Sequence, residues 1–315
     1  MAPSLLAGGL AWWLVRLLCR VTGLRDARFR LALYGLPLLK STLVLLGIGV
    51  VLPWPPLLAR WRALAVPWDV ALPSALIWAG LTLIIQDAVR RRKYREILAD
   101  AVPAAASLQQ TLDEVIRACR QTRGWAQRLR APFVAHPGRL PAALPLFLSL
   151  RAPAPVVLTT PGEEAVLLPA SLPEQLAQKE LAGVLAHEVA HLMVDRPGPL
   201  SPTWWSLLTP LSPVALLLDR ELQREVEIAC DAVAAELIKD PATYAQALIK
   251  SYRFAANAHR TGQTAWSAIA GLTGVRPLLT ERVEELLRER SAIDAPWFQA
   301  AAGYLAWMAT WALLF

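Results

Sequence analysis

The feature that most constrains this chain is a pair of histidines four residues apart, in the run His187-Glu188-Val189-Ala190-His191. On an α-helix, positions i and i+4 share one face, so both imidazoles can bind one metal ion. Glu188 lies about a quarter turn away and can act on a water molecule without being a ligand. The alternative is a helix whose histidines merely face a polar surface. The motif predicts a helix and favours a zinc site with its own general base.

The flanking residues predict the helix that carries this motif. Ser171 is a suitable N-cap, the helix would begin at Pro173, and Glu174 would complete a capping box. Apolar residues recur at helical spacing at Leu176, Leu181, Val184, Leu185, Val189 and Leu192. The helix is expected to end before Pro197-Gly198-Pro199, because both residue types break helices. The histidines therefore lie inside a helix.

A tetrahedral zinc held by two histidines and a water needs one more protein ligand. Glu227 is the best candidate, and it shares a helix face with Asp231 at i, i+4. Asp231 is predicted to accept a hydrogen bond from a ligating histidine, and the alternative is an ordinary surface acid. Glu225 is expected to face solvent. The sequence thus predicts one Zn2+ per chain.

Together, the two motifs resemble the BlaR/MecR-type membrane metallopeptidases, in which H-E-x-x-H is followed by E-x-A-C-D. The second element here is Glu227-Ile228-Ala229-Cys230-Asp231. The stretches that resemble the edge strand and helix flanking that family's active site are residues 154–158, 165–169 and 181–185. The resemblance covers residues 90–290.

Carried over to this sequence, the resemblance implies zinc ligands His187, His191 and Glu227, with Glu188 as the catalytic base. Related prenyl-protein-type and heat-shock-type membrane metallopeptidases more often have E-x-x-A-D as the second motif, and Cys230 favours the BlaR/MecR type. The receptors of that family carry a penicillin-binding sensor domain, and no such domain is expected here.

The composition predicts a membrane protein, because 55% of the residues are hydrophobic and thirteen are tryptophan. We expect transmembrane helices at residues 4–19, 31–52, 70–89 and 296–315. The expected domains are a three-helix membrane domain (1–89), a cytoplasmic metallopeptidase domain (90–295) and a C-terminal transmembrane helix (296–315). Residues 201–218 are apolar but broken by prolines, so they are expected to form a re-entrant or interfacial segment, or else a buried helix.

Basic residues predict the orientation of these spans. Arginines follow the first span, and Arg90-Arg91-Arg92-Lys93 follows the third. Cytoplasmic flanks carry such residues, so both termini are expected on the outer side of a bacterial inner membrane, with the peptidase domain in the cytoplasm. The net charge of +7 fits attraction to the lipid bilayer. No aromatic and basic recognition pattern suggests a nucleic-acid partner.

The predicted fold class is a mainly α membrane protein with four transmembrane helices and a cytoplasmic α+β zincin-like domain. Helical periodicity covers residues 98–121, 241–258 and 280–290, and short strands are expected at 146–150, 156–160 and 164–168. An edge strand beside the zinc helix would bind a substrate by adding the substrate backbone to the sheet.

Two further residues are candidates for contacting an oxyanion or the substrate. Arg282 matches a position where similar membrane metallopeptidases often have an arginine, and His259 lies in a polar stretch. Without geometry, solvent exposure is the simpler interpretation for His259. The three cysteines lack metal-binding spacing and indicate reduced thiols.

The predicted function is a zinc endopeptidase that cleaves a cytoplasmic or membrane-proximal protein, in signalling by repressor cleavage. Its expected partners are a protein or peptide substrate, a separate sensor or repressor protein, and further copies of the chain in a homo-oligomer. Alternatives are a protease for maturation or quality control of membrane proteins, and a non-catalytic zinc-bound scaffold. Glu188 argues against the scaffold, because a structural zinc has no use for a base.

Overall fold

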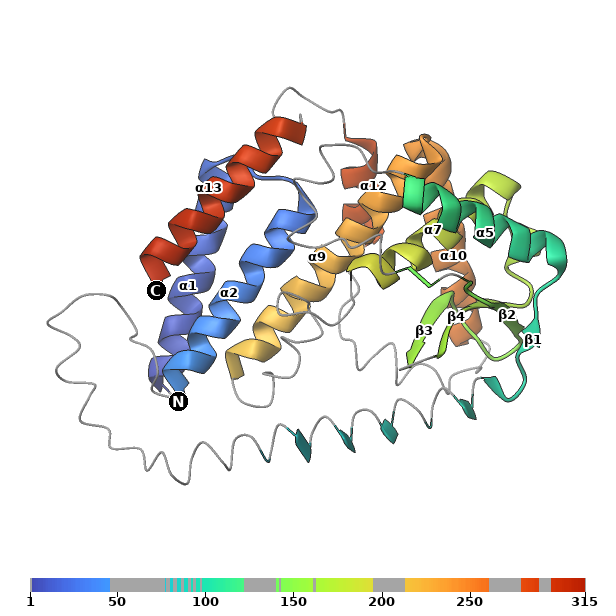
Figure 1. Cartoon of the computed structure of the whole chain (residues 1–315), viewed down its shortest axis with the longest axis horizontal. Helices are drawn as coiled ribbons and strands as arrows, with labels where there is room; N and C mark the ends of the chain where they lie inside the picture. Colours follow the sequence, from blue (N-terminus) through green and yellow to red (C-terminus); the bar gives the residue numbers. More distant parts are fainter. Residues whose placement is uncertain are drawn as a thin grey trace, which may run out of the picture. The chain divides into compact units, whose positions relative to one another are not determined.

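The computed structural model shows a mostly helical protein with one small sheet (Figure 1). The residues that it describes are 2–45, 98–121, 140–160, 163–194, 213–260, 279–288 and 296–314, except Ala142, with scattered positions between 77 and 96. They form two compact units. Unit 1 comprises Met1–Asp87, Pro197–Glu225 and Arg290–Phe315. Unit 2 comprises Ala88–Arg196 and Val226–Glu289.

Three helices pack side by side in unit 1: α1 (Ala2–Val21), α2 (Ala27–Leu45) and α13 (Pro296–Leu314). The ring of Phe29 lies edge-on to Tyr304, with 5.8 Å between ring centroids, and leaves no room for a side chain on Gly303. Gln299 of α13 binds the turn between α1 and α2, because its Oε1 accepts hydrogen bonds from the N–H groups of Arg25 and Asp26. Apolar contacts and this polar anchor together hold the three helices.

The prediction of transmembrane helices is wrong. Among the residues that the structure describes, no helix combines the length and the apolar character needed to cross a bilayer. Helix α1 contains Arg16 and Arg20, and α2 contains Arg30 and Lys40, which would be expensive inside lipid. The expected span 70–89 lies largely outside the described residues. The predicted multi-pass placement in an inner membrane and the predicted sides of the termini depended on these spans, so they are wrong too.

Apolar side chains of these helices face one another, which explains why hydropathy alone was misleading. In α1, Ala7, Ala11 and Val15 recur every four residues and are almost fully buried. Such a stripe packs a helix against its neighbours. Lys40 is also buried, with 2% of its surface exposed. The buried stripe accounts for only part of the apolar character of α1, because Leu6, Trp13 and Val21 of the same helix are exposed.

The sheet of unit 2 is mixed and has the strand order β1-β2-β4-β3. Its strands are β1 (Val102–Pro103), β2 (Leu146–Ser149), β3 (Val156–Thr160) and β4 (Glu163–Pro169). β2 and β4 are parallel, and the other two pairs are antiparallel. The three expected strands are confirmed, whereas β1 is too short to leave a pattern. β3 is an edge strand, as the sequence suggested.

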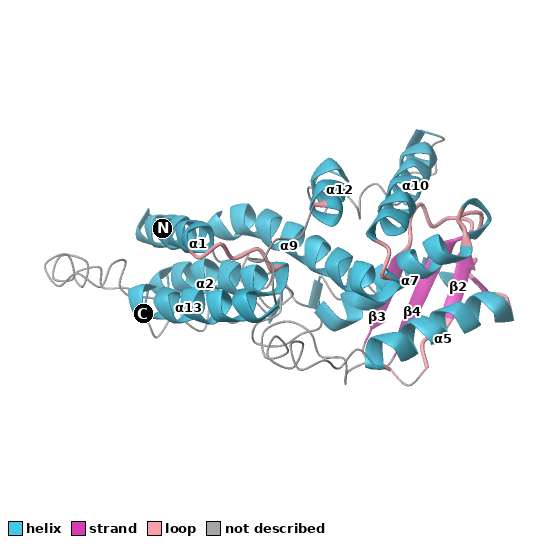
Figure 2. Ribbon diagram, turned by 90° about the horizontal axis from the view of Figure 1, so that it is seen from above, coloured by secondary structure: helices cyan, strands magenta, loops and turns pink. Residues whose placement is uncertain are grey.

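Alternation along β4 gives the sheet two apolar faces. Val166 and Leu168 pack into the main core, while Ala165 and Leu167 join a smaller cluster on the other face. Helices α5 (Ala106–Gln121) and α7 (Gln178–Val194) contribute to the main core and lie against the sheet (Figure 2). Helices α10 (Pro241–Arg260) and α12 (Leu279–Leu287) also belong to this unit.

Helix α7 begins later than its flanking sequence predicted. Residues Pro173–Gln175 form a short 3-10 turn, η2, with no side-chain cap. The carboxylate of Glu180 instead accepts the backbone N–H of Ala177 at 2.7 Å, which satisfies a donor at the start of α7. Glu180 also accepts a hydrogen bond from Lys250 of α10 at 2.7 Å. The capping carboxylate of α7 is therefore that of Glu180, six residues after the predicted Glu174.

Helix α9 (Pro213–Ile238) is a single helix that contributes residues to both units. It takes in residues 213–218 of the expected re-entrant segment, and residues 201–212 lie outside the described part. The expectation that Glu225 faces solvent is wrong. Its side chain is fully buried and forms an ion pair with Arg30 of α2. The charge of this carboxylate is therefore compensated by the guanidinium of Arg30 and not by water.

Candidate metal centre

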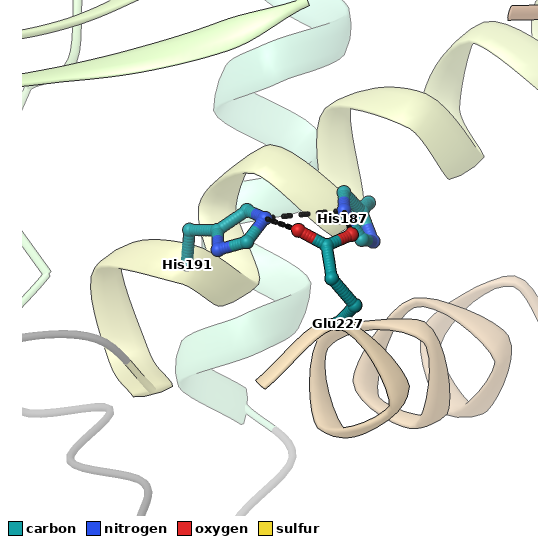
Figure 3. Close-up of side chains that lie close together, drawn as sticks. All are labelled: His187, His191 and Glu227. Carbon is teal, nitrogen blue, oxygen red and sulfur yellow. Dashed lines mark hydrogen bonds and ion pairs between the residues drawn. The ribbon is translucent and has the colours of Figure 1, made fainter. Parts of the chain in front are cut away.

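Two imidazoles and one carboxylate converge in unit 2. The Nε2 atoms of His187 and His191 lie 3.1 Å apart on successive turns of α7. The Glu227 carboxylate reaches them from α9, with Oε2 at 3.5 Å from the Nε2 of His187 and Oε1 at 3.8 Å from that of His191 (Figure 3). These three residues could hold a metal ion. The structure therefore brings together the three ligands that the sequence predicted.

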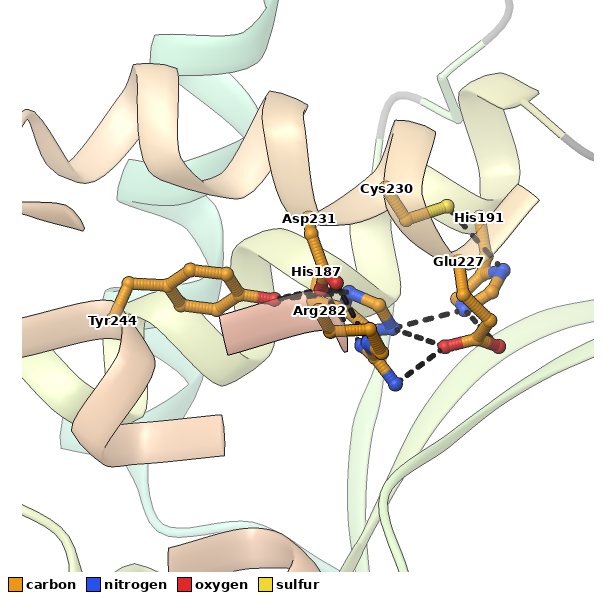
Figure 4. A network of polar contacts seen from close by, with 7 residues as sticks. All are labelled: His187, His191, Glu227, Cys230, Asp231, Tyr244 and Arg282. Carbon is orange, nitrogen blue, oxygen red and sulfur yellow. Dashed lines mark hydrogen bonds and ion pairs between the residues drawn. The ribbon is translucent and has the colours of Figure 1, made fainter. Parts of the chain in front are cut away.

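The other edge of the His187 ring faces two oxygen atoms. Its Nδ1 lies 3.0 Å from Oδ1 of Asp231 and 3.1 Å from the hydroxyl of Tyr244 on α10. The Tyr244 hydroxyl also donates a hydrogen bond to Asp231 at 2.6 Å (Figure 4). Asp231 is 2% exposed, so it is a buried partner of a candidate ligand and not a surface acid. Such a partner orients a ligating histidine and makes it more basic.

Arg282 of α12 binds both carboxylates of α9. Its Nε and Nη2 donate to Oδ2 and Oδ1 of Asp231 at 2.6 and 2.7 Å, which is a bidentate pair. Its Nη1 lies 2.9 Å from Oε2 of Glu227. The guanidinium, predicted as an oxyanion or substrate contact, is thus placed where it positions a ligand carboxylate.

Electrostatics keep both carboxylates charged. Burial raises the pKa of Glu227, but Arg282 and the two histidines outweigh burial and hold that pKa well below its usual range. Burial likewise opposes ionisation of Asp231, and its hydrogen bonds from Arg282 lower its pKa overall. Burial lowers the pKa of His187, but hydrogen bonds to Asp231 and Glu227 raise it to about 9. The two ionised carboxylates therefore favour a positive charge at the position between the imidazoles and Glu227.

The second histidine has a different neighbour. The Nδ1 of His191 lies 3.5 Å from the Sγ of Cys230, and its ring stands edge-on to that of His187 at 87°. Cys230 is fully buried in α9. A small apolar side chain at this position lets α9 approach α7 closely enough for Glu227, one turn earlier, to reach the imidazoles.

Glu188 follows His187 in α7 and is 7% exposed. A buried carboxylate on the helix that carries both histidines is suited to proton transfer. His259 lies near the end of α10, and its side chain is outside the described part of the chain. The proposed contact between His259 and a substrate stays a prediction.

Sequence reasoning did not find Tyr244, which lies 57 residues from His187 on another helix. No local periodicity connects the two positions. One feature of the sequence does point to such a partner. Gly183 lies inside the predicted helix about one turn before His187, where glycine lowers helix stability. An interior glycine of this kind indicates that another group approaches the helix closely.

Comparison with protein-family models finds no match to this chain, and comparison with curated proteins finds none either.

Proposed function

We propose that this chain is a zinc-dependent endopeptidase. Its ligands are His187, His191 and Glu227, and Glu188 is the general base. The observation that carries the proposal is the convergence of two Nε2 atoms and a carboxylate within 3.8 Å, beside a buried glutamate of the same helix. The resemblance of both motifs to BlaR/MecR-type metallopeptidases supports the same activity.

The three residues fit zinc in chemistry and in spacing. A tetrahedral zinc with bonds of about 2.0–2.1 Å places neighbouring ligand atoms roughly 3.4 Å apart. The separations between the donor atoms are 3.1, 3.5 and 3.8 Å. Two imidazoles with one carboxylate are a donor set of catalytic zinc sites, in which the fourth position takes water or substrate. Zinc is therefore the metal that we assign to this site.

Bound zinc would supply Lewis-acid polarisation of the scissile carbonyl and would acidify a water molecule. The carboxylate of Glu188 would act as the general base, accepting a proton from an attacking water molecule as the water oxygen bonds to the carbonyl carbon. The C–N bond then breaks, and Glu188 returns the proton to the leaving nitrogen. One water is consumed, and a carboxyl and an amine are formed.

The sheet supports a peptide as the substrate. β3 lies at the end of the strand order and packs against α7, which carries both histidines. An extended peptide that adds to β3 would satisfy its own backbone N–H and C=O groups along this edge. In such binding, hydrogen bonds to the peptide backbone contribute more than contacts with its side chains. This mode of binding suits an endopeptidase that acts on a protein substrate.

The test compares Glu188→Gln with the parent protein on a quenched-fluorescence peptide library, with bound zinc measured in both. Loss of the base should slow cleavage by about 10²–10⁴-fold while zinc stays at one per chain. Glu174→Gln is the control, because Glu174 is exposed outside α7. Equal cleavage by Glu188→Gln would refute its role. Stoichiometric zinc without cleavage by the parent would favour the structural-zinc alternative.

A further inference from the structure

We propose that Tyr244 is a positioning residue for the metal centre, which fixes His187 with its hydrogen on Nδ1 and its Nε2 lone pair toward the metal. The inference deepens the proposed zinc site and rests on His187 being a ligand. It assigns a role to a side chain that is 1% exposed and that the hydrolytic steps do not use.

The hydrogen bonds fix the direction of each donor. A tyrosine hydroxyl has a single hydrogen, and that of Tyr244 points to Oδ1 of Asp231 at 2.6 Å. Its oxygen can therefore only accept at the Nδ1 of His187, 3.1 Å away. Asp231 also accepts there, at 3.0 Å. Since both neighbours of Nδ1 are acceptors, Nδ1 carries the hydrogen, and in the neutral ring Nε2 is left with its lone pair.

Gly183 makes this position available to the tyrosine ring. A Cβ at Gly183 would lie 2.9 Å from Cδ2 of Tyr244, closer than side chains tolerate. Gly183 lies one turn before His187 on α7. The Tyr244 hydroxyl points toward His187 and Asp231 (Figure 4). Glycine inside a helix costs about 1 kcal/mol relative to alanine, and contact with Tyr244 accounts for its presence.

The location of the hydroxyl excludes direct catalysis. It lies at the Nδ1 edge of the ring, whereas the ligand atoms of His191 and Glu227 lie at the Nε2 edge. Its only hydrogen is donated to Asp231. Tyr244 therefore acts on the metal through His187 and has no donor to offer an oxyanion.

The decisive variant is Tyr244→Phe, which keeps the ring against Gly183 and removes only the hydroxyl. Zinc affinity is measured by competition with a chromophoric chelator. The tautomer of His187 is measured by ¹⁵N NMR of the ring nitrogens in the metal-free protein, above the pKa of about 9, where the ring is neutral. We expect zinc affinity to fall about 10–100-fold and the ¹⁵N shifts of His187 to change, because its Nδ1 loses the Tyr244 oxygen and keeps Asp231 as an acceptor. Tyr252→Phe is the matched control, because Tyr252 lies on the same helix and is 47% exposed.

Unchanged zinc affinity together with unchanged His187 shifts in Tyr244→Phe would overturn the inference. Gly183→Ala is a second variant that keeps the hydroxyl but displaces the ring, and it should weaken zinc binding too. If Tyr244→Phe fails to fold, unaltered zinc binding by a folded Gly183→Ala overturns the inference instead. Neither readout depends on cleavage, so failure of the peptidase proposal alone would leave the zinc and NMR results intact.

Discussion

At the scale of single residues, Asp231 has three partners in the candidate metal centre. Its two oxygens receive hydrogen bonds from Arg282 and Tyr244, and Oδ1 also faces His187. All of these groups are buried. A charge in such a position is compensated only while every partner is present.

We predict that Asp231→Asn weakens zinc binding about 10–100-fold, because His187 loses the anionic partner of its Nδ1–H. It should also lower the free energy of unfolding by about 3–5 kcal/mol, since Arg282 loses a buried counter-charge. Chelator competition and urea denaturation measure the two effects. Asp113→Asn, at an exposed position of α5, should change the free energy of unfolding by less than about 0.5 kcal/mol. Parent-like stability of Asp231→Asn would show that Glu227 alone compensates Arg282.

Glu180 gives a pH-dependent prediction. Burial raises its pKa, but hydrogen bonds from Lys250 and the N–H of Ala177 lower it below the ordinary value of 4.5. A depressed folded-state pKa stabilises the fold fully above pH 4.5, and this stabilisation is lost as pH falls through the folded-state pKa. In urea denaturation, Glu180→Gln should be less stable than the parent at pH 7. The difference should shrink steadily below pH 4.5. A difference that is constant with pH would show that the charge of Glu180 contributes nothing.

At the scale of elements, the site depends on how closely α9 and α10 approach α7 and on how α12 binds α9. Cys230 of α9 packs near His191, Gly183 of α7 contacts Tyr244 of α10, and Arg282 of α12 binds α9. Small residues at the crossings set these approaches, and hydrogen bonds fix their register. Helix packing is thus the condition for ligand geometry.

We predict that Gly183→Ala lowers the free energy of unfolding by about 1–3 kcal/mol, because the new methyl group overpacks against Tyr244. Gly9→Ala is the control, since a Cβ at Gly9 of α1 would meet nothing within 4 Å. That substitution should stabilise by up to about 1 kcal/mol through helix propensity. Thermal denaturation of both variants checks the contrast. Similar stability changes in the two variants would mean that Tyr244 moves aside without strain.

At the scale of the whole molecule, the three residues that could hold a metal ion belong to unit 2, although α9 supplies residues to both units. Ligands from two separate stretches of chain meet only in the folded state, so the metal binds the folded state in preference to the unfolded one. Metal binding and folding of this unit are therefore linked.

We predict that zinc raises the melting temperature and that chelation reverses the effect. At a free zinc concentration of about 100 Kd, the added stability should be about 2.7 kcal/mol. Differential scanning calorimetry with and without a chelator measures it. His191→Ala removes a ligand and should abolish the response to zinc. A response that persists in this variant would place the stabilising zinc elsewhere.

Local patterns in the sequence predicted the motif helix, the three longer strands and the face shared by Glu227 and Asp231, because each depends on periodicity over a few residues. The start of α7 was misplaced, because Ser171 with Glu174 matches a capping box. In the structure Glu180 instead binds the N–H of Ala177, whose own side chain cannot cap a helix. The spans were wrong for a similar reason. An apolar stripe has the same hydropathy whether it contacts lipid or other helices, so hydropathy does not reveal which of them the stripe contacts.

The sequence by itself determined which residues can bind a metal, because ligand type and i, i+4 spacing are properties of one helix at a time. Only the tertiary structure decided that Glu225 is buried against Arg30, that Arg282 binds carboxylates, and that Tyr244 meets His187. These contacts join residues far apart in the chain. They arise from the packing of whole helices, which no local pattern specifies.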